Sequence, residues 1–345
     1  MNRTFRLLAL VSWLFCCSLL VGSCRSDTES KDQKDKPATG SLPVPDSSLQ
    51  KVTLLPYWIT TSQFAGYYIG KQKGIFRKHG IDLEILAFQP AMETPQLIRE
   101  GKASFFLLWL VNAIELKASG LDIVNIAQLS TRSSLLLVTK KSSGIRTIKD
   151  MNGKRAGIWL GYELQPRVLF QQEGIDVKII PIGSSNNLFL AAGVEIINAS
   201  WFDEYHTILN SGYDPDELET FFFADYGLNF LEDGIYCMKS ALERDPGLCR
   251  RFVEASLESW IYAFAHPEEA IALILEEQKK QRIPANLAHQ RWTLARYHDL
   301  FLPEGEPNLN TTLKESDYQN IAGILQKAGL IGTIPAFQDF YKPAY

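Results

Sequence analysis

Three tryptophans in this sequence follow apolar, strand-like runs: Trp58, Trp109 and Trp159. A tryptophan ring can stack on a flat heterocycle and contribute about 0.5–1.5 kcal/mol beyond the burial of its area. For any one of the three, packing in the core is the alternative. In open α/β sheets, however, ligands bind beyond the carboxyl ends of the strands. Because all three rings stand at such ends, we expect them to form an aromatic slot for a planar ligand.

Polar and aromatic side chains next to these strand ends are further candidates. Glu204 lies in the segment Asp203-Glu204-Tyr205, where a strand gives way to a helix. Its carboxylate could accept hydrogen bonds from a ligand, or could only favour the dipole of a helix that Asp203 caps. Tyr226 and Asp233 are expected on the hinge side of the site. The predicted ligand-binding residues are therefore Trp58, Gln63, Phe64, Trp109, Asn112, Trp159, Tyr162, Glu163, Glu204, Tyr226 and Asp233.

Strands and helices alternate along the part of the chain that must position these residues. Repeated strand–helix units that end in glycine indicate parallel sheets covered by helices, so the fold class is α/β. The alternation runs twice and ends in a helical tail, which predicts two lobes with a ligand cleft between them. We expect residues 51–139 to form the first part of lobe 1 and residues 140–230 to form lobe 2. Residues 231–345 are expected to return to lobe 1 and to add the C-terminal helices.

The first residues are typical of an export signal. Arg3 and Arg6 precede an apolar run that is too short to span a bilayer comfortably, and the run ends in Val-Gly-Ser before Cys24. This pattern resembles the lipobox of bacterial lipoproteins, so we predict a signal peptide over residues 1–23 and lipidation of Cys24. An ordinary secretory signal is the alternative. Residues 24–50 are polar and are expected to form a flexible linker between the lipid and the domain.

Composition narrows the classes of partner. Hydrophobic residues make up 46% of the chain and charged residues 21%, and the net charge of −4 gives no indication of nucleic-acid binding. Cys237 and Cys249 are the only cysteines after Cys24. They could form a disulfide in an oxidising compartment, but we expect them to be buried and unpaired. No group of Cys and His residues has the spacing in the sequence that a metal site needs, so we expect no metal and no cofactor.

Long segments of the chain resemble the NMT1/THI5-like (SsuA/THI5) solute-binding proteins. The resemblance rests on LPYWITTSQFAGYYIGKQKGIFRKHGIDLEIL from Leu55, LLLVTKKSSGIRTIKDMNGKRAGIW from Leu135, and WFDEYHTILNSGYD from Trp201. It implies a type II periplasmic-binding-protein fold and a monomer in the cell envelope that delivers its ligand to an ABC permease. The ligand implied is a thiamine-pyrimidine (HMP) precursor, whose amino group an acidic residue near Glu204 binds in pyrimidine-binding relatives.

The same resemblance includes an enzyme, the THI5-type thiamine pyrimidine synthase, which depends on pyridoxal phosphate and iron. Its cofactor lysine and consumed histidine align with Leu108 and Asn112, which cannot form a Schiff base or replace an imidazole. Its cysteine-rich run aligns with residues 225–232, which contain no cysteine. A receptor for riboflavin or a sulfonate is a further alternative. A sulfonate needs a cation, and only Arg132 and Arg167 are candidates near the cleft.

Overall fold

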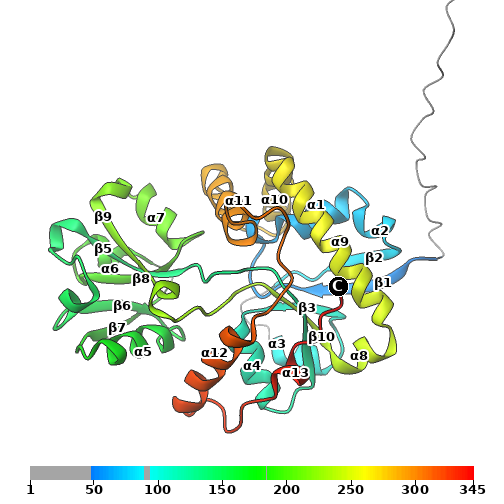
Figure 1. Ribbon diagram of the computed structural model, residues 1–345. Coiled ribbons are helices and arrows are strands. Elements are labelled where there is room, and N and C mark those ends of the chain that lie inside the picture. Colours follow the sequence, from blue (N-terminus) through cyan, green and yellow to red (C-terminus); the bar gives the residue numbers. More distant parts are fainter. Residues whose placement is uncertain (1–47, 89–93, 184) are drawn as a thin grey trace, which may run out of the picture. The chain divides into compact units, whose positions relative to one another are not determined.

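The computed structural model describes residues 48–345 except 89–93 and 184. The predicted signal peptide, Cys24 and most of the predicted linker lie outside the described residues. Two five-stranded sheets organise the described part of the chain, one in each of two lobes (Figure 1). Within that part, no helix is both long and apolar enough to cross a membrane.

The sheet of lobe 1 has the strand order β2-β1-β3-β10-β4. Strand β1 runs parallel to β2 and β3, whereas β10 runs antiparallel to both of its neighbours. Its strands are β1 (Gln50–Leu55), β2 (Ile81–Ile85), β3 (Phe105–Leu108), β4 (Ile123–Gln128) and β10 (Gly234–Met238). The last strand is reversed because it enters the sheet from lobe 2.

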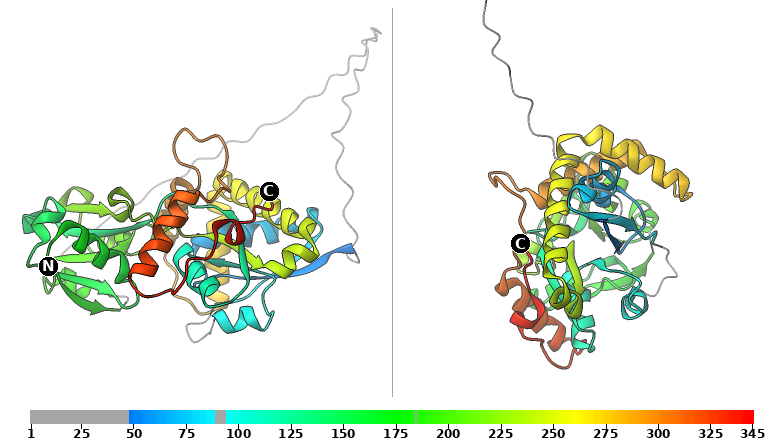
Figure 2. Two further views of the ribbon diagram at one scale, coloured as in Figure 1. Left: turned by 60° about the horizontal axis from the view of Figure 1, so that its bottom comes forward. Right: turned by 90° about the vertical axis from the view of Figure 1, so that its right-hand side faces the viewer.

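Helices cover both faces of this first sheet (Figures 1 and 2). One face packs against α1 (Ala65–Gln72), α2 (Ile75–Lys78), α9 (Pro246–Ala265), α10 (Pro267–Lys280) and α11 (Leu287–Phe301). The other face packs against α3 (Thr94–Arg99), α4 (Leu110–Ala118), α12 (Glu315–Lys327) and α13 (Phe337–Phe340), and α8 (Lys239–Arg244) precedes α9. On the first face, Gly66 lets α1 approach α9, because an added Cβ would lie 2.4 Å from the Trp260 ring.

The sheet of lobe 2 has the order β7-β6-β8-β5-β9, and here β5 is the reversed strand. Its strands are β5 (Leu135–Lys140), β6 (Arg155–Trp159), β7 (Lys178–Ile182), β8 (Ile196–Ser200) and β9 (Leu218–Phe222), with helices α5 (Leu164–Glu173), α6 (Asn187–Leu190) and α7 (Glu204–Asn210). The sequence pattern placed residues 135–139 at the end of lobe 1. The structure instead pairs them with β8 and β9 of the lobe 2 sheet. The sequence could not show this, because an apolar strand pattern does not indicate which sheet the strand joins.

Two segments cross between the lobes, one before β5 and one before β10. Glu232 in the returning segment is fully buried, and its carboxylate accepts hydrogen bonds from the Ser134 N–H and hydroxyl at 3.0 Å each. The Ser133 N–H donates to the Asn229 amide oxygen at 2.7 Å. Asp233 has a positive φ of 57°, a conformation that non-glycine residues rarely adopt. The two crossing segments are therefore tied to each other by buried polar contacts.

Cys237 on β10 and Cys249 on α9 are buried and not bonded to each other, with their sulfur atoms 4.0 Å apart. They belong to the core that packs between the lobe 1 sheet and α9. The expectation of two buried, unpaired cysteines agrees with this arrangement.

Candidate functional site

A cavity of about 650 Å³ lies between the two lobes and is lined by residues of both. This volume is within the range of roughly 300–1,000 Å³ found for sites of small organic ligands. Its lobe 1 wall comes mainly from the loop after β1 and from one side of α4, and its lobe 2 wall comes mainly from the ends of β6 and β8. Of the residues predicted from the sequence, the cavity brings together Trp58, Gln63, Trp109, Asn112, Trp159, Tyr162 and Glu204.

Two predicted residues lie behind the lobe 1 wall rather than on it. Phe64 is buried in the core, with its ring edge-on to Tyr57 at 5.4 Å. Asp233 is also buried, and it accepts a hydrogen bond of 2.9 Å from the Tyr57 hydroxyl. Tyr57 itself lines the cavity. The two residues therefore support the wall through Tyr57, because their own side chains point into the core.

Two more predicted residues do not line the cavity. The Glu163 carboxylate turns back to its own loop and accepts a hydrogen bond of 2.9 Å from the Gly161 N–H. Tyr226 is half-buried in the one-turn helix Phe223–Tyr226, where it packs against the core around the sheets. Glu163 follows the end of β6 and Tyr226 precedes the crossing to β10, but position in the sequence does not fix the direction of a side chain.

The aromatic residues of the cavity form a continuous wall that crosses from one lobe to the other. The rings of Trp58 and Trp159, from opposite lobes, have centroids 6.5 Å apart and are tilted by 53°. Trp109 and Tyr162 also meet across the lobes, edge-on at 5.3 Å. A flat ring held between two others needs roughly 7–8 Å, or two contacts of about 3.5–4.0 Å. The tryptophans therefore offer one wall for a planar ligand to lie against, and not a slot between Trp58 and Trp159.

One tryptophan also offers an unpaired donor. Trp159 is held at the end of β6 by its own N–H, which donates to the Asn198 amide oxygen on β8 at 2.8 Å. The indole Nε1 of Trp159 is buried and makes no hydrogen bond with any residue that the structure describes. Because a buried polar group without a partner is unfavourable, this N–H is suited to an acceptor atom on a ligand.

All charged side chains among the described lining residues are acidic. Glu115, Asp203 and Glu204 line the cavity, and none of the lining residues that the structure describes is Lys, Arg, His or Cys. Among the described residues, no three His, Cys, Asp or Glu side chains gather into a group that could hold a metal ion. The site is therefore built for a ligand that donates hydrogen bonds or carries positive charge.

Glu204 is the best-positioned of the three acids. It begins α7 directly after β8, and its Oε2 accepts hydrogen bonds from the N–H of Ser200, at 2.8 Å, and from the Ser200 hydroxyl. These bonds fix the carboxyl group through Oε2, and no side chain among the described residues donates to Oε1. Burial, followed by the charge of Asp203, raises the pKa of Glu204 to about 7. The group therefore changes charge near neutral pH.

Sequence reasoning missed several residues of the lining. Tyr57 was overlooked beside the more prominent Trp58, although both follow β1. Asn198 and Ser200 face the cavity from β8, and two alternate polar residues at the end of an apolar strand are the signal that would have found them. Asp203 lines the cavity and makes no side-chain cap to α7, so its expected role as a helix cap is not the one seen.

Comparison with known proteins identifies relatives over most of the chain. A protein of Haemophilus influenzae provisionally named for thiamine biosynthesis is 22% identical over 316 residues, which cover 87% of this chain and 94% of that protein. The 4-amino-5-hydroxymethyl-2-methylpyrimidine phosphate synthase of Legionella pneumophila is 25% identical over 252 residues, or 69% of this chain and 77% of that one.

Solved structures agree on the fold. The periplasmic aliphatic sulphonate binding protein SsuA of Escherichia coli superposes with a TM-score of 0.67 at 14% identity, covering 85% of this chain and 92% of that one. At this identity the likeness shows the two-lobed binding-protein fold alone. The family model described as NMT1/THI5 like matches residues 61–270, more than half of the chain. The chain therefore belongs to the NMT1/THI5-like family.

Proposed function

We propose that this protein is the substrate-binding component of an ABC importer and that it binds a planar heterocycle with an amino group, of the aminopyrimidine type. The observation that carries the proposal is the cavity lining, in which an aromatic wall faces three carboxyl groups and no cationic side chain among the described residues. A flat ring suits the wall, and an amino group suits the carboxyl groups. Relatives named for pyrimidine phosphate synthesis and thiamine biosynthesis support the same ligand class.

Glu204 is the residue we assign to the amino group. Its Oε2 is fixed by Ser200, and no side chain in the described part of the chain donates a hydrogen bond to Oε1. When Glu204 is ionised, Oε1 accepts a hydrogen bond from the amino group, and a charge-assisted bond of this kind contributes about 1.5–3 kcal/mol. The indole N–H of Trp159, which has no partner among the described residues, can donate to a ring nitrogen or hydroxyl of the same ligand.

A sulfonate is the poorer candidate, although SsuA shares the fold. A sulfonate needs a cation or several N–H donors to replace its hydration. Arg132 pairs instead with Asp225 at 2.7 Å, and neither Arg132 nor Arg167 lines the cavity. The three carboxyl groups of the lining would repel an anion.

The synthase is the second candidate, because a named synthase is among the relatives. Leu108 and Asn112, which the resemblance to the family aligns with the lysine and histidine of the synthase, both line the cavity. No lysine is present among the described lining residues to form a Schiff base with pyridoxal phosphate. We therefore propose binding and delivery rather than chemistry for this site.

Export and anchoring complete the proposal. The signal peptide over residues 1–23, lipidation of Cys24 and the polar linker would hold the domain at the cell envelope beside a permease. The closed lobes would present the ligand to that permease. These features rest on the sequence pattern of the N-terminus.

Thermal-shift measurements on the purified protein test the ligand class. We expect stabilisation by 4-amino-5-hydroxymethyl-2-methylpyrimidine, and little or none by its analogue with hydrogen in place of the amino group, by riboflavin or by ethanesulfonate. Stabilisation by ethanesulfonate alone would overturn the proposal. A covalent complex with pyridoxal phosphate, detected by absorbance of the Schiff base, would favour the synthase instead.

A further inference from the structure

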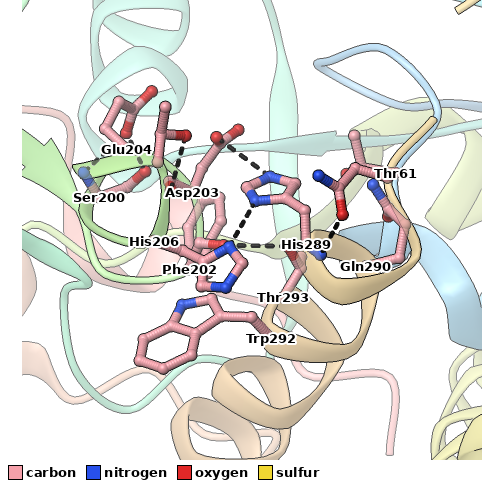
Figure 3. A network of polar contacts seen from close by, with 12 residues as sticks. Thr61, Ser200, Phe202, Asp203, Glu204, His206, His289, Gln290, Trp292 and Thr293 are labelled. Carbon is pink, nitrogen blue, oxygen red and sulfur yellow. Dashed lines mark hydrogen bonds and ion pairs between the residues drawn. The ribbon is translucent and has the colours of Figure 1, made fainter. Parts of the chain in front are cut away.

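The lobes also meet behind the cavity, where α7 of lobe 2 faces α11 of lobe 1. Figure 3 shows His289 of α11 between Asp203 and His206, which flank the start of α7. The His289 Nε2 lies 3.3 Å from Asp203 Oδ1, and the Nδ1 atoms of His289 and His206 are 3.0 Å apart. These three residues, which we call the cross-lobe latch, make a continuous polar chain from one lobe to the other.

The latch is embedded in further contacts between the same two elements. The His206 ring stacks on Trp292 of α11, with centroids 5.0 Å apart and planes within 19°. The Trp292 indole N–H donates to the Trp201 carbonyl at 2.8 Å, and the Thr293 hydroxyl donates to the Phe202 carbonyl at 2.9 Å. Every one of these bonds joins α11 to the segment at the start of α7, so opening the lobes breaks them together.

The latch is also connected to the ligand cavity. Phe202, Asp203 and Glu204 line the cavity on the lobe 2 side. On the lobe 1 side, Gln290 is the neighbour of His289, and its amide oxygen accepts a hydrogen bond of 2.7 Å from the Ser62 N–H, next to the cavity residue Gln63. The orientation of the Asp203 carboxylate at the cavity therefore depends on a histidine that the other lobe supplies.

The histidine pair permits only certain proton arrangements. Two Nδ1 atoms 3.0 Å apart form a hydrogen bond only if one carries a proton and the other offers its lone pair. His289 can carry protons on both nitrogens, donating to Asp203 and to His206, while His206 stays neutral. If His206 is also protonated, two N–H groups face each other and the bond is lost. The latch is thus compatible with one charged histidine and not with two.

The surroundings of His206 favour its neutral form. Burial, followed by the charge of His289, lowers the pKa of His206, and Asp203 opposes this effect. The other charged groups nearby are Glu204 on the cavity side and Arg296 of α11, whose guanidinium lies over the Trp292 ring at 4.7 Å. Asn210, one turn along α7, contacts His206 Nδ1 at 3.1 Å and adds no charge.

We propose that His289 is a cross-lobe positioning residue that holds Asp203 in the cavity wall and keeps the lobes closed at neutral pH, and that protonation of His206 in mild acid releases it. Because the chain itself supplies every group of the latch, closure responds to pH whether or not a ligand is bound. Acidification therefore shifts the protein toward the open form.

Spin-label distances between the lobes test the proposal without added ligand, so the result does not depend on which molecule the cavity binds. Labels are attached to cysteines that replace Lys71 in lobe 1 and Lys178 in lobe 2, both exposed. The parent protein should show one short distance at about pH 7.5 and a longer population at about pH 5. That open population should rise roughly tenfold, the effect of losing one charge-assisted hydrogen bond.

Three substitutions separate the latch from a general effect of acid. His206→Gln keeps an acceptor for His289 but does not titrate, so it should stay closed at both pH values. His289→Gln loses the link to Asp203 and should be more open at both. His298→Gln is the matched control, because His298 is on the same helix, is about half exposed and lies beside Asp299. A parent protein that does not respond to pH, or a His206→Gln variant that responds as the parent does, would overturn the proposal.

Discussion

Substitution of the buried hinge carboxyl by an amide, Glu232→Gln, should make the protein less sensitive to alkaline pH. Glu232 is fully buried in the segment that returns to lobe 1, and burial, followed by the charge of Asp233, raises its pKa to about 8 against the hydrogen bonds from Ser134. The carboxyl group is therefore protonated at neutral pH. An amide oxygen in the place of Oε1 can accept the same hydrogen bonds from the Ser134 N–H and hydroxyl and from the Ser133 hydroxyl, which lies 3.2 Å away.

The sign of the effect follows from proton linkage. Between an ordinary glutamate pKa of about 4.5 and the folded value of about 8, the folded state binds more protons than the unfolded state. The stability contributed by this group is therefore present below about pH 4.5 and is lost as the pH rises to about 8. Each pH unit between the two pKa values corresponds to about 1.4 kcal/mol, which gives a ceiling of about 5 kcal/mol. Water that enters the hinge when Glu232 ionises reduces this energy, so we expect the free energy of unfolding to fall by about 2 kcal/mol.

Urea unfolding of the parent protein and of Glu232→Gln at about pH 5.5 and pH 8.5 measures this difference. Between the two pH values, the free energy of unfolding of the parent should fall by about 2 kcal/mol more than that of the variant. The variant should be the more stable protein at the higher pH. Glu306→Gln, which replaces an exposed carboxyl group, is the control and should behave as the parent does. An unchanged pH dependence in Glu232→Gln would refute the reasoning, because the buried carboxyl would then titrate as it does in the unfolded chain.

Three further predictions concern packing and the cavity. Gly66→Ala should lower the free energy of unfolding, measured in urea, by about 1–3 kcal/mol, because the added Cβ would overlap the Trp260 ring. Gly323→Ala is the control, because nothing lies within 4 Å of its added Cβ, and it should be neutral or stabilising by up to about 1 kcal/mol. Trp58→Ala should weaken the binding of 4-amino-5-hydroxymethyl-2-methylpyrimidine by roughly tenfold in calorimetry through loss of the aromatic wall, and unchanged affinity would contradict this use of the ring. The same titration should give about tenfold weaker binding at pH 6 than at pH 8, because protonation of Glu204, with its pKa of about 7, removes the acceptor for the amino group; a pH-independent affinity would show that the ionised form is not the one that binds.

The sequence predicted the fold and much of the cavity for a clear physical reason. Trp58, Trp109 and Trp159 follow strands whose carboxyl ends share the edges that face the cleft, so residues far apart in the chain had to meet. Glycines in the left-handed conformation mark the helix ends that the pattern predicted, as at Gly174 after α5, with φ of 62°. Local rules of this kind act within one strand–helix unit and can be read from the chain.

What could not be predicted depends on contacts between units. The reversed strand β5 joins lobe 2 because β8 and β9 accept it there, which its own apolar pattern does not reveal. Phe64 and Asp233 point into the core, behind Tyr57, because of the packing around them. The contact of His289 with Asp203 joins residues that are far apart in the chain, and neither residue has a local signal for the other.

The most direct test of the central claim is calorimetric titration of 4-amino-5-hydroxymethyl-2-methylpyrimidine into the parent protein, Glu204→Gln and Glu163→Gln at about pH 8. Glu163 is the matched control, because it is an acidic neighbour of the site whose carboxylate bonds its own loop and does not line the cavity. We predict binding to the parent, roughly 10- to 100-fold weaker binding to Glu204→Gln, as expected for loss of one charge-assisted hydrogen bond, and unchanged binding to Glu163→Gln. Absence of binding to the parent, or equal affinity for the parent and Glu204→Gln, would contradict the assignment of this cavity to an amino-bearing heterocycle.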